Sequence, residues 1–275
     1  SALNFVVHKQ VGRCRASTIT LPHGQVRTPV FMPVGTKGAM KGLLSDTLTS
    51  LVDCDIMLSN TYHLFLTPGE QILEEQGGCH NFMRWNRNLL TDSGGFQIVS
   101  LDALNSIDEE GVTFQSALDG RRRKLTPEIA IAIQEALGSD IAMQLDECVA
   151  NTCEHAPAKA AMLLSARWGE RSKAYFGHRD RQALFGIVQG GTDLVMRAES
   201  AQRTVSVTSG DVSGFDGYGI GGLSVGETRQ EMLPALAAAL EHLPAHRPRY
   251  LMGVGDPASL VEAVGLGVDQ FDCVM

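Results

Sequence analysis

The sequence lacks the features by which several classes of protein are recognised. No apolar run in its 275 residues reaches the roughly 20 residues that a membrane-spanning helix needs. The first ten residues have no long apolar core of the kind found in signal peptides. There is no internal repeat, low-complexity segment or linker. We therefore expect a cytoplasmic protein without a membrane span, unless a targeting segment has been removed.

Cysteine is scarce, and its spacing suits neither disulfides nor metal. None of the six cysteines forms a Cys-x-x-Cys pair, so reduced cytosolic thiols are expected; they are Cys14, Cys54, Cys79, Cys148, Cys153 and Cys273. A Gly-x-Gly-x-x-Gly segment after the first expected strand is also missing. That absence gives no support to dinucleotide binding.

Basic residues are outnumbered, since the formal net charge is -8. Nucleic-acid binders usually carry a basic surface, so the balance argues mildly against that class. One basic run exists, Arg-Arg-Arg-Lys at residues 121–124. We expect it to be a solvated loop, with contact to RNA as the alternative.

What the sequence does contain is an alternation of short apolar runs with segments of helical periodicity. The runs cover residues 30–34, 56–58, 88–90, 141–145, 184–188, 218–220, 250–252 and 268–271. Runs of this kind, bounded by turn residues, are typical of buried parallel strands. Eight of them predict an α/β fold, a (β/α)₈ TIM barrel, which needs about 250 residues. A doubly wound sheet is the alternative.

Two of the intervening helices are well marked. Thr126 is the expected N-cap of the first, Pro127 its first residue, and Gly138 its stop. Residues 230–243 are the second, in which Pro234 is tolerable only near the first turn.

Polar residues and glycine follow seven of the eight expected strands. In an α/β barrel these positions form the active-site mouth, where aspartates act as nucleophile, base or ligand anchor. Each is also ordinary turn or N-cap chemistry, and paired carboxylates would equally fit a glycosidase. The positions are Asn60, Thr61, Asp92, Ser93, Gly94, Gly95, Asp146, Glu147, Gln189, Gly190, Gly191, Gly221, Gly222, Gly253, Val254, Gly255 and Asp272.

These segments resemble the signatures of the tRNA-guanine transglycosylases, also called queuine or preQ1 tRNA-ribosyltransferases. The resemblance covers roughly residues 30–275, with the segments in family order. They are Pro33-Val34-Gly35-Thr36, Asn60-Thr61-Tyr62-His63-Leu64, Thr91-Asp92-Ser93-Gly94-Gly95-Phe96-Gln97, Gly138-Ser139-Asp140-Ile141, Gly221-Gly222-Leu223-Ser224-Val225-Gly226-Glu227, Tyr250-Leu251-Met252-Gly253-Val254-Gly255 and Phe271-Asp272-Cys273-Val274.

The resemblance implies a (β/α)₈ barrel and a pentosyltransferase activity in queuosine modification. The family exchanges guanine at the anticodon wobble position, in tRNAs for aspartate, asparagine, histidine and tyrosine, for a 7-deazaguanine. Asp272 matches its nucleophile, which forms a covalent enzyme–tRNA intermediate. Asp92 matches its proton acceptor and general acid.

The resemblance also implies residues that bind base and tRNA. Asp146 matches the group that accepts from the purine amino and ring N–H edge, and Gln189 and the Gly222 backbone match donors to the base carbonyl. Phe96 and Met252 match the sides of a stacking slot, although apolar residues at strand ends are usually core. Ser93, Gly94, Gly95, Cys148, Leu223 and Val225 complete the substrate site, and Gly253, Val254, Gly255, Asp256, Pro257, Ala258 and Ser259 match a loop that touches tRNA.

The family also implies zinc and a partner subunit. Its Zn²⁺ is held by three cysteines and one histidine after the nucleophile strand. This sequence ends at Met275, so we expect a single barrel over residues 1–275 that is C-terminally incomplete, with the zinc ligands beyond it. The family forms homodimers, or heterodimers with a non-catalytic paralogue. A non-catalytic tRNA-binding subunit is the alternative function, but it would be expected to lack Asp92 or Asp272.

The incoming base is preQ1 in bacterial members of the family and queuine in most eukaryotic ones. Cys148 and Val225 resemble the bacterial pocket, since a β-branched residue at 225 narrows it. Leu21-Pro22-His23-Gly24 and Met143-Gln144-Leu145-Asp146 look more eukaryotic. The hypothesis is preQ1, with queuine left open.

Overall fold

The computed structural model describes residues 2–101, 105–116 and 118–274. Met275, the last residue of the sequence, lies outside the described residues. Eight parallel strands form the central sheet: β4 (Val30–Met32), β5 (Ile56–Ser59), β6 (Asn88–Thr91), β10 (Ile141–Met143), β11 (Ala183–Val188), β14 (Gly217–Ile220), β15 (Arg249–Leu251) and β16 (Gln270–Asp272).

The sheet closes on itself. Its order is β4-β16-β15-β14-β11-β10-β6-β5, and a parallel bridge from Val34 to Leu58 joins the two ends. All eight predicted strands are therefore present, with boundaries shifted by up to two residues. The predicted (β/α)₈ barrel is confirmed, and the doubly wound alternative is wrong because an open sheet would leave β4 and β5 apart.

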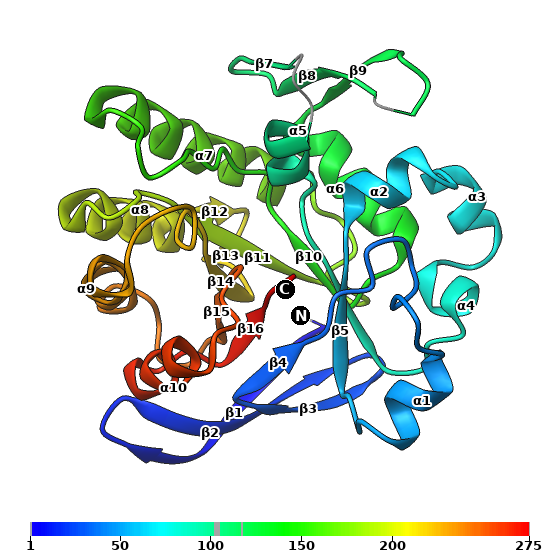
Figure 1. Cartoon of the computed structure of the whole chain (residues 1–275), viewed down its shortest axis with the longest axis horizontal. Coiled ribbons are helices and arrows are strands. Elements are labelled where there is room, and N and C mark those ends of the chain that lie inside the picture. The colour runs from blue at the N-terminus through cyan, green and yellow to red at the C-terminus, as the bar shows by residue number, and fades with distance from the viewer. Residues whose placement is uncertain (1, 102–104, 117, 275) are drawn as a thin grey trace.

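The helices surround the barrel on both sides of the view in Figure 1. Those from the first half of the chain are α1 (Ser45–Ser50), α2 (Thr61–Leu66), α3 (Glu70–Glu75), α4 (Cys79–Met83), α5 (Gly95–Leu101) and α6 (Pro127–Leu137). The others are α7 (His155–Tyr175), α8 (Leu194–Ser206), α9 (Arg229–Leu240) and α10 (Pro257–Leu266). Among the helices that the structure describes, none combines the length and the apolar composition that a membrane span requires.

The two helices predicted in detail are both present. In α6 the Thr126 side chain accepts from the Ile129 N–H, Pro127 is the first residue, and Gly138 ends the helix at φ +67°. The second, α9, begins after a capping box between Thr228 and Glu231. The expectation for Pro234 is wrong in detail. Because this box starts the helix at residue 229, the proline lies in the second turn.

Three antiparallel elements were not predicted. They are a sheet of β1 (Asn4–Val11), β2 (Cys14–Leu21) and β3 (Gly24–Thr28), a sheet of β7 (Asn105–Ile107), β8 (Val112–Gln115) and β9 (Arg122–Leu125), and a pair of β12 (Thr208–Ser209) and β13 (Val212–Ser213). The expected solvated loop at residues 121–124 is therefore wrong, since Arg122, Arg123 and Lys124 lie in β9. Lys124 pairs with Asp108 and Glu110.

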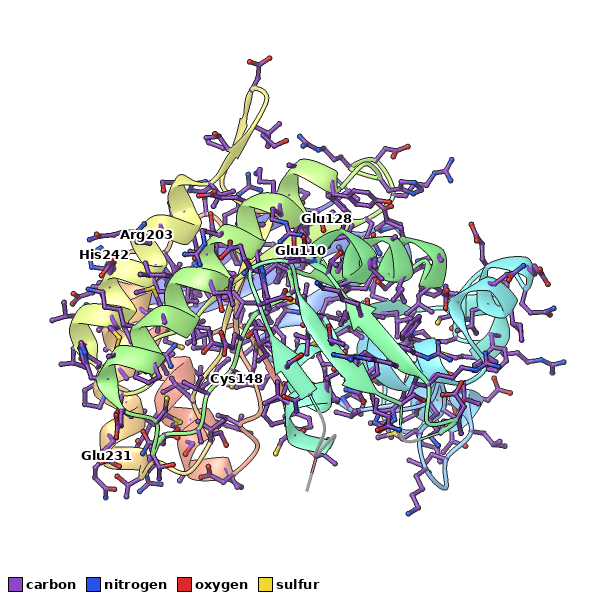
Figure 2. The ribbon with its side chains drawn as sticks, turned by 90° about the horizontal axis from the view of Figure 1, so that it is seen from above. Glu110, Glu128, Cys148, Arg203, Glu231 and His242 are labelled. Carbon is purple, nitrogen blue, oxygen red and sulfur yellow. The ribbon has the colours of Figure 1, made fainter. Side chains whose placement is uncertain are left out.

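One arginine fastens the β7–β9 sheet to the helical shell. The Arg171 guanidinium on α7 donates to both Glu128 carboxylate oxygens on α6, each at 2.8 Å. It also donates to the backbone carbonyls of Glu109 and Glu110, at 2.7 and 3.1 Å. Figure 2 shows Glu110 and Glu128 beside each other at this junction.

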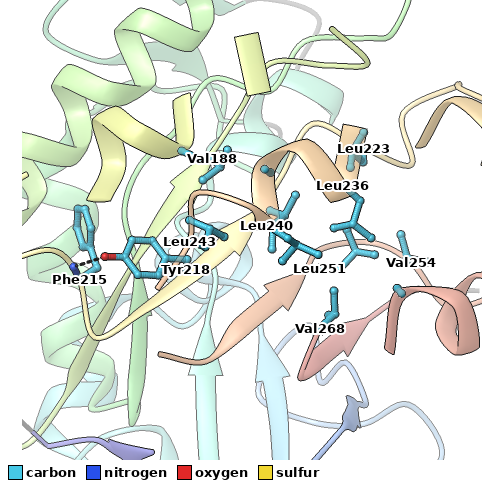
Figure 3. Packing of buried hydrophobic residues seen from close by; sticks show 14 of the residues in the cluster. Val188, Phe215, Tyr218, Leu223, Leu236, Leu240, Leu243, Leu251, Val254 and Val268 are labelled. Atoms are coloured by element: carbon cyan, nitrogen blue, oxygen red, sulfur yellow. Dashed lines mark hydrogen bonds between the residues drawn. The ribbon is translucent and has the colours of Figure 1, made fainter. Parts of the chain in front are cut away.

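Two packed regions hold the strand ends in place. Between barrel and helices, Leu236 and Leu240 of α9 pack with Tyr218 and Leu251 of the neighbouring strands (Figure 3). Inside the barrel, strand residues such as Phe185 pack with side chains from β2 and β3, namely Ile19, Leu21 and Val26. The β1–β3 sheet therefore contributes part of the barrel core.

Candidate active site

The carboxyl ends of the barrel strands surround a cavity of about 270 Å³. Twelve of the predicted site residues line it: Asp92, Ser93, Phe96, Asp146, Cys148, Gln189, Gly222, Leu223, Val225, Met252, Gly253 and Asp272. They come from separate strand ends, as expected for the catalytic face of an α/β barrel. Three carboxyl groups and a group of glycines thus share one pocket.

Asp92 follows β6 and is held by three N–H donors. The Thr61 backbone N–H donates to Oδ1 at 2.8 Å, and the amides of Asn60 and Gln97 donate to Oδ2 at 2.5 and 2.9 Å. The side chain is buried, with 8% of the residue exposed. Burial raises the pKa of Asp92 to about 6, because the three donors offset only part of the desolvation and the nearby Asp272 adds to the rise. Asp92 is therefore a carboxyl group that gains and loses a proton close to neutral pH.

Asp146 lies beyond the end of β10 and faces two donors. The Gln189 amide donates to Oδ2 at 2.6 Å, and the Ser93 hydroxyl donates to Oδ1 at 3.4 Å. Burial raises the pKa of Asp146 to about 6 as well. The base-binding residues predicted from three different strand ends are thus hydrogen-bonded to one another.

Asp272, in β16, is held through one of its two oxygens. The Tyr250 hydroxyl and the Gly253 N–H both donate to Oδ1, at 2.5 and 2.9 Å. Burial raises the pKa of Asp272, and both donors oppose that rise by favouring the ionised form. No hydrogen bond to Oδ2 is present among the residues that the structure describes. Asp272 thus lines the pocket with one carboxyl oxygen held by two donors and the other free of hydrogen bonds to the described residues.

The remaining predicted residues take different positions. Gly94 and Gly95 do not line the cavity. A Cβ at Gly95 would come within 2.9 Å of the Asp146 carbonyl oxygen, so this glycine lets the β6 end pack against the β10 end. Phe96 is half exposed, at 50%, and does line the pocket. The alternative that Phe96 is an ordinary core residue is therefore wrong.

The predicted tRNA loop divides into buried and exposed positions. Val254, Gly255 and Ser259 are buried, and Val254 belongs to the core between α9, α10 and the strands. Gly253, Asp256, Pro257 and Ala258 are exposed. Asp256 also caps α10 by accepting from the Ser259 N–H at 3.0 Å. Four of the seven positions are thus open to a large ligand beside the pocket.

Sequence reasoning named Tyr250, Gln97 and Asn60 within the family segments, and Asn60 also as a strand end, but gave none of them a role. Each of the three contacts a predicted catalytic carboxyl group directly. Tyr250 could have been found from the two-residue period of a strand, since it stands two positions before Met252. Gln97 stands five residues after Asp92, a spacing that gives no signal before the local turn is known.

Comparison with known proteins supplies the class of enzyme. The family model for queuine tRNA-ribosyltransferase matches residues 11–275. A queuine tRNA-ribosyltransferase from Caulobacter vibrioides is 51% identical over 276 residues, covering 100% of this chain and 72% of that protein. One from Acinetobacter baumannii is 49% identical, covering 97% of this chain and 69% of that protein. One from Acinetobacter baylyi is 47% identical and covers 100% and 70%.

The chain belongs to the queuine tRNA-ribosyltransferase family. It is thereby an enzyme of the pentosyltransferase class, and the family resemblance seen in the sequence is confirmed. The predicted glycosidase alternative is set aside by the same match.

The residues of this family member that the structure describes do not fit the family's expected zinc site. The only group of three or more histidine, cysteine or acidic side chains close enough to share a metal, among the described residues, is His23, His80 and Asp140. It contains no cysteine. Its two imidazole rings stack at a centroid distance of 3.6 Å, and Asp140 lies next to the amino end of β10, away from the pocket.

Proposed function

We propose that this chain exchanges guanine at the wobble position of tRNAs whose anticodon begins with guanine for a 7-deazaguanine base. The observation that carries the proposal is the set of three carboxyl groups, Asp92, Asp146 and Asp272, around one pocket in a member of this family. The tRNAs are those for aspartate, asparagine, histidine and tyrosine, and the product belongs to queuosine modification.

Asp272 is the nucleophile in this proposal. Tyr250 and Gly253 hold Oδ1, so Oδ2 attacks C1′ of the ribose, and the C1′–N9 bond breaks with its electron pair going to guanine. The product is a covalent aspartyl–ribose intermediate. The incoming base then attacks C1′ through its ring nitrogen and releases the Asp272 carboxylate. Two inversions return the sugar to its starting configuration.

Asp92 carries the proton in both halves of the reaction. Protonated Asp92 gives its proton to the departing guanine, and the resulting carboxylate takes the ring N–H proton of the incoming base. A pKa of about 6 suits both roles near neutral pH, because a usable fraction of each form is present.

Asp146, Gln189 and Gly222 read the base edge. The Asp146 carboxylate accepts from the amino and ring N–H groups of guanine, which are donors. The Gln189 amide turns from Asp146 toward the 6-oxo group, and the Gly222 backbone donates to the same oxygen. The hydrogen bond between Gln189 and Asp146, at 2.6 Å, supports this role by joining the two groups.

The base lies in a slot between Phe96 and Met252, both of which line the pocket. We take preQ1 as the incoming base, because Cys148 and Val225 also line the pocket and the β-branched residue narrows it. A competition assay with preQ1 and queuine tests this choice. Queuine incorporated as well as or better than preQ1 would refute it.

The assignment of the whole chain follows from the same family membership. We propose one catalytic barrel over residues 1–275, working in the cytoplasm, with tRNA against the exposed part of residues 253–259. A homodimer, or a heterodimer with a non-catalytic paralogue, is the proposed assembly. We propose that the residues of this chain that the structure describes do not hold the family's zinc, because none of their groupings offers the expected cysteine and histidine ligands. Metal analysis of the purified 275-residue chain should then find no stoichiometric zinc.

Exchange of radiolabelled guanine into tRNA tests the proposed reaction. Unmodified tRNA with guanine at the wobble position should take up label, and the same tRNA with adenine there should not. Absence of uptake into the guanine tRNA by folded protein would favour a non-catalytic tRNA-binding subunit instead. The same assay with a candidate partner added would then decide between the two.

A further inference from the structure

Arg197 on α8 is fully buried and donates only to backbone carbonyls. Its Nε donates to Gly191 O at 2.6 Å, and its Nη1 donates to Val188 O and Gly221 O at 3.1 and 2.6 Å. Its Nη2 donates to Gly222 O at 2.9 Å. One guanidinium thus joins the carboxyl ends of β11 and β14.

No carboxylate pairs with Arg197 among the described residues, which is unusual for a buried cation. Transfer of a charge out of water costs free energy that a carboxylate partner normally offsets. The other buried arginine among the described residues, Arg15, has such a partner in Asp269, at an N–O distance of 2.6 Å. Arg197 has carbonyl oxygens in that place. The function of this buried guanidinium is therefore to be sought in the backbone segments whose carbonyl groups it binds.

The four carbonyl groups belong to the backbone around Gln189 and Gly222, the residues proposed to bind the 6-oxo group of the base. Val188 and Gly191 flank Gln189, while Gly221 and Gly222 form the turn after β14. In a planar trans peptide the C=O and the following N–H point in opposite directions. Arg197 does not line the pocket, whereas Gly221, Gly222 and Leu223 do. Two carbonyls turned toward Arg197 therefore turn the N–H groups of Gly222 and Leu223 away from Arg197.

Two further observations agree with this orientation. Burial raises the pKa of the Cys148 thiol to about 12, and a hydrogen bond with the Gly222 backbone opposes the rise, so that backbone faces a pocket residue. Gly222 has φ +64°, and a Cβ there would collide with Gln189 Oε1. The turn at Gly221 and Gly222 is thus left-handed at Gly222 and closely packed, and its two carbonyl groups are bound by Arg197.

We propose that Arg197 is a positioning residue that aims two backbone N–H groups, those of Gly222 and Leu223, at the 6-oxo group of the base. The inference rests on the proposed base exchange and adds a specificity determinant to it. Arg197 reads no base atom itself. It fixes donors that would otherwise be free to rotate with the glycine turn, and it connects them to the strand end that carries Gln189.

Arg197→Lys tests the proposal, with Arg203→Lys as the matched control. Lysine keeps the charge but lacks the planar fork that spans four carbonyls. Arg203 lies on the same helix and is exposed (Figure 2). It pairs with Glu199. We expect the KM for guanine to rise about tenfold or more in Arg197→Lys, with the KM for tRNA unchanged. Inhibition by 2-aminopurine, which lacks the 6-oxo group, should change little. Arg203→Lys should behave like the wild type.

A measurement on the wild type covers the case in which Arg197→Lys does not fold. The guanidinium N–H signals of Arg197 in ¹⁵N NMR should shift when guanine binds, and those of Arg15 should not. A folded Arg197→Lys with wild-type guanine KM and wild-type preference over 2-aminopurine would overturn the proposal, as would unshifted Arg197 signals with guanine bound. Failure of the proposed reaction is distinguishable, because it appears as absent exchange in the wild type.

Discussion

Three carboxyl groups face one pocket, and the donors around each of them differ. Asp92 has three N–H donors divided between its two oxygens, Asp146 has one donor on each oxygen, and Asp272 has two donors on Oδ1 alone. These differences suit a proton carrier, a group that reads the base and a nucleophile, respectively. Substitutions that change one donor or one charge therefore give distinct expected results.

Tyr250→Phe removes a donor from Asp272 without changing the size of the ring. The hydroxyl holds down the pKa of Asp272, so its loss should raise that pKa. The ionised fraction of the nucleophile then falls at low pH, and the acid limb of the kcat/KM profile moves to higher pH. A hydrogen bond to a charged group contributes about 1.5–3 kcal/mol. We therefore expect kcat/KM at pH values on the acid limb to fall by about tenfold or more.

Tyr218→Phe is the control for this profile. Tyr218 is equally buried and lies in the adjacent strand β14, but its hydroxyl accepts from the Phe215 N–H, away from the pocket. Its profile should overlay that of the wild type. An unshifted acid limb in a folded Tyr250→Phe would contradict the role given to this hydroxyl.

Asp146→Asn should stabilise the protein while impairing base binding. Burial raises the pKa of Asp146 to about 6, so the folded state binds this proton more tightly than the unfolded state does. The contribution to stability is full below about pH 4 and is lost as the pH rises through about 6. The neutral amide escapes that loss, so we expect the free energy of unfolding at pH 8 to rise by up to about 3 kcal/mol.

Urea unfolding between pH 4 and 8 measures the effect. The difference from the wild type should shrink toward zero as the pH falls to 4, because Asp146 is then protonated in the folded state and increasingly protonated in the unfolded state as well. Asp211→Asn, in the exposed turn between β12 and β13, is the control, and its stability should stay within about 0.5 kcal/mol of the wild type. A variant with the same stability increment at every pH would show that its cause is not the buried charge.

At the scale of elements, the β1–β3 sheet is predicted to be part of the barrel rather than an appendage. Ile19 of β2 is fully buried in the same cluster as Met143 and Phe185. Ile19→Ala should therefore reduce the free energy of unfolding by about 2–5 kcal/mol. Val11→Ala, at a residue of β1 that is 70% exposed, should change it by less than about 0.5 kcal/mol in the same titration. Equal small effects would mean that the sheet can detach without opening the core.

The barrel strands were predictable from sequence, whereas the antiparallel sheets were not. Buried parallel strands such as β11 carry apolar residues on both faces and end in glycine or a polar residue, which gives a sharp signal. The strand β1 is largely exposed, and β9 is a short, only partly buried run of three basic residues and a leucine, so their composition resembles that of loops. Ion pairs of Arg123 and Lys124 on β9 depend on turns that are defined only in three dimensions.

The candidate site was predicted residue by residue where a strand end supplies it. Asp92, Gln189 and Asp272 each follow or end a recognisable strand, and all three line one pocket. The burial of Arg197 was not predictable from the sequence. The helix that carries it reads as an ordinary amphipathic helix, and an arginine in such a helix is normally at the surface. Its role depends on the close approach of α8 to the turns after β11 and β14.

At the scale of the whole molecule, barrel closure brings residue 272 next to residues near the start of the chain. β16 pairs with β4, and Val34, just after β4, bridges to Leu58 of β5. Asp272 and Asp92 therefore face the same cavity although 180 residues separate them. The central claim, covalent base exchange on Asp272 with Asp92 as proton carrier, depends on that closure.

The most direct test is to trap the intermediate. Wild type and Asp272→Asn are incubated with unmodified tRNA and guanine, denatured and examined for a protein–tRNA adduct alongside label exchange. The account predicts an adduct and exchange in the wild type, with no adduct and at least about 10³-fold slower exchange in a folded Asp272→Asn. Exchange in Asp272→Asn at a rate near that of the wild type, or an adduct that forms without this carboxylate, would contradict it.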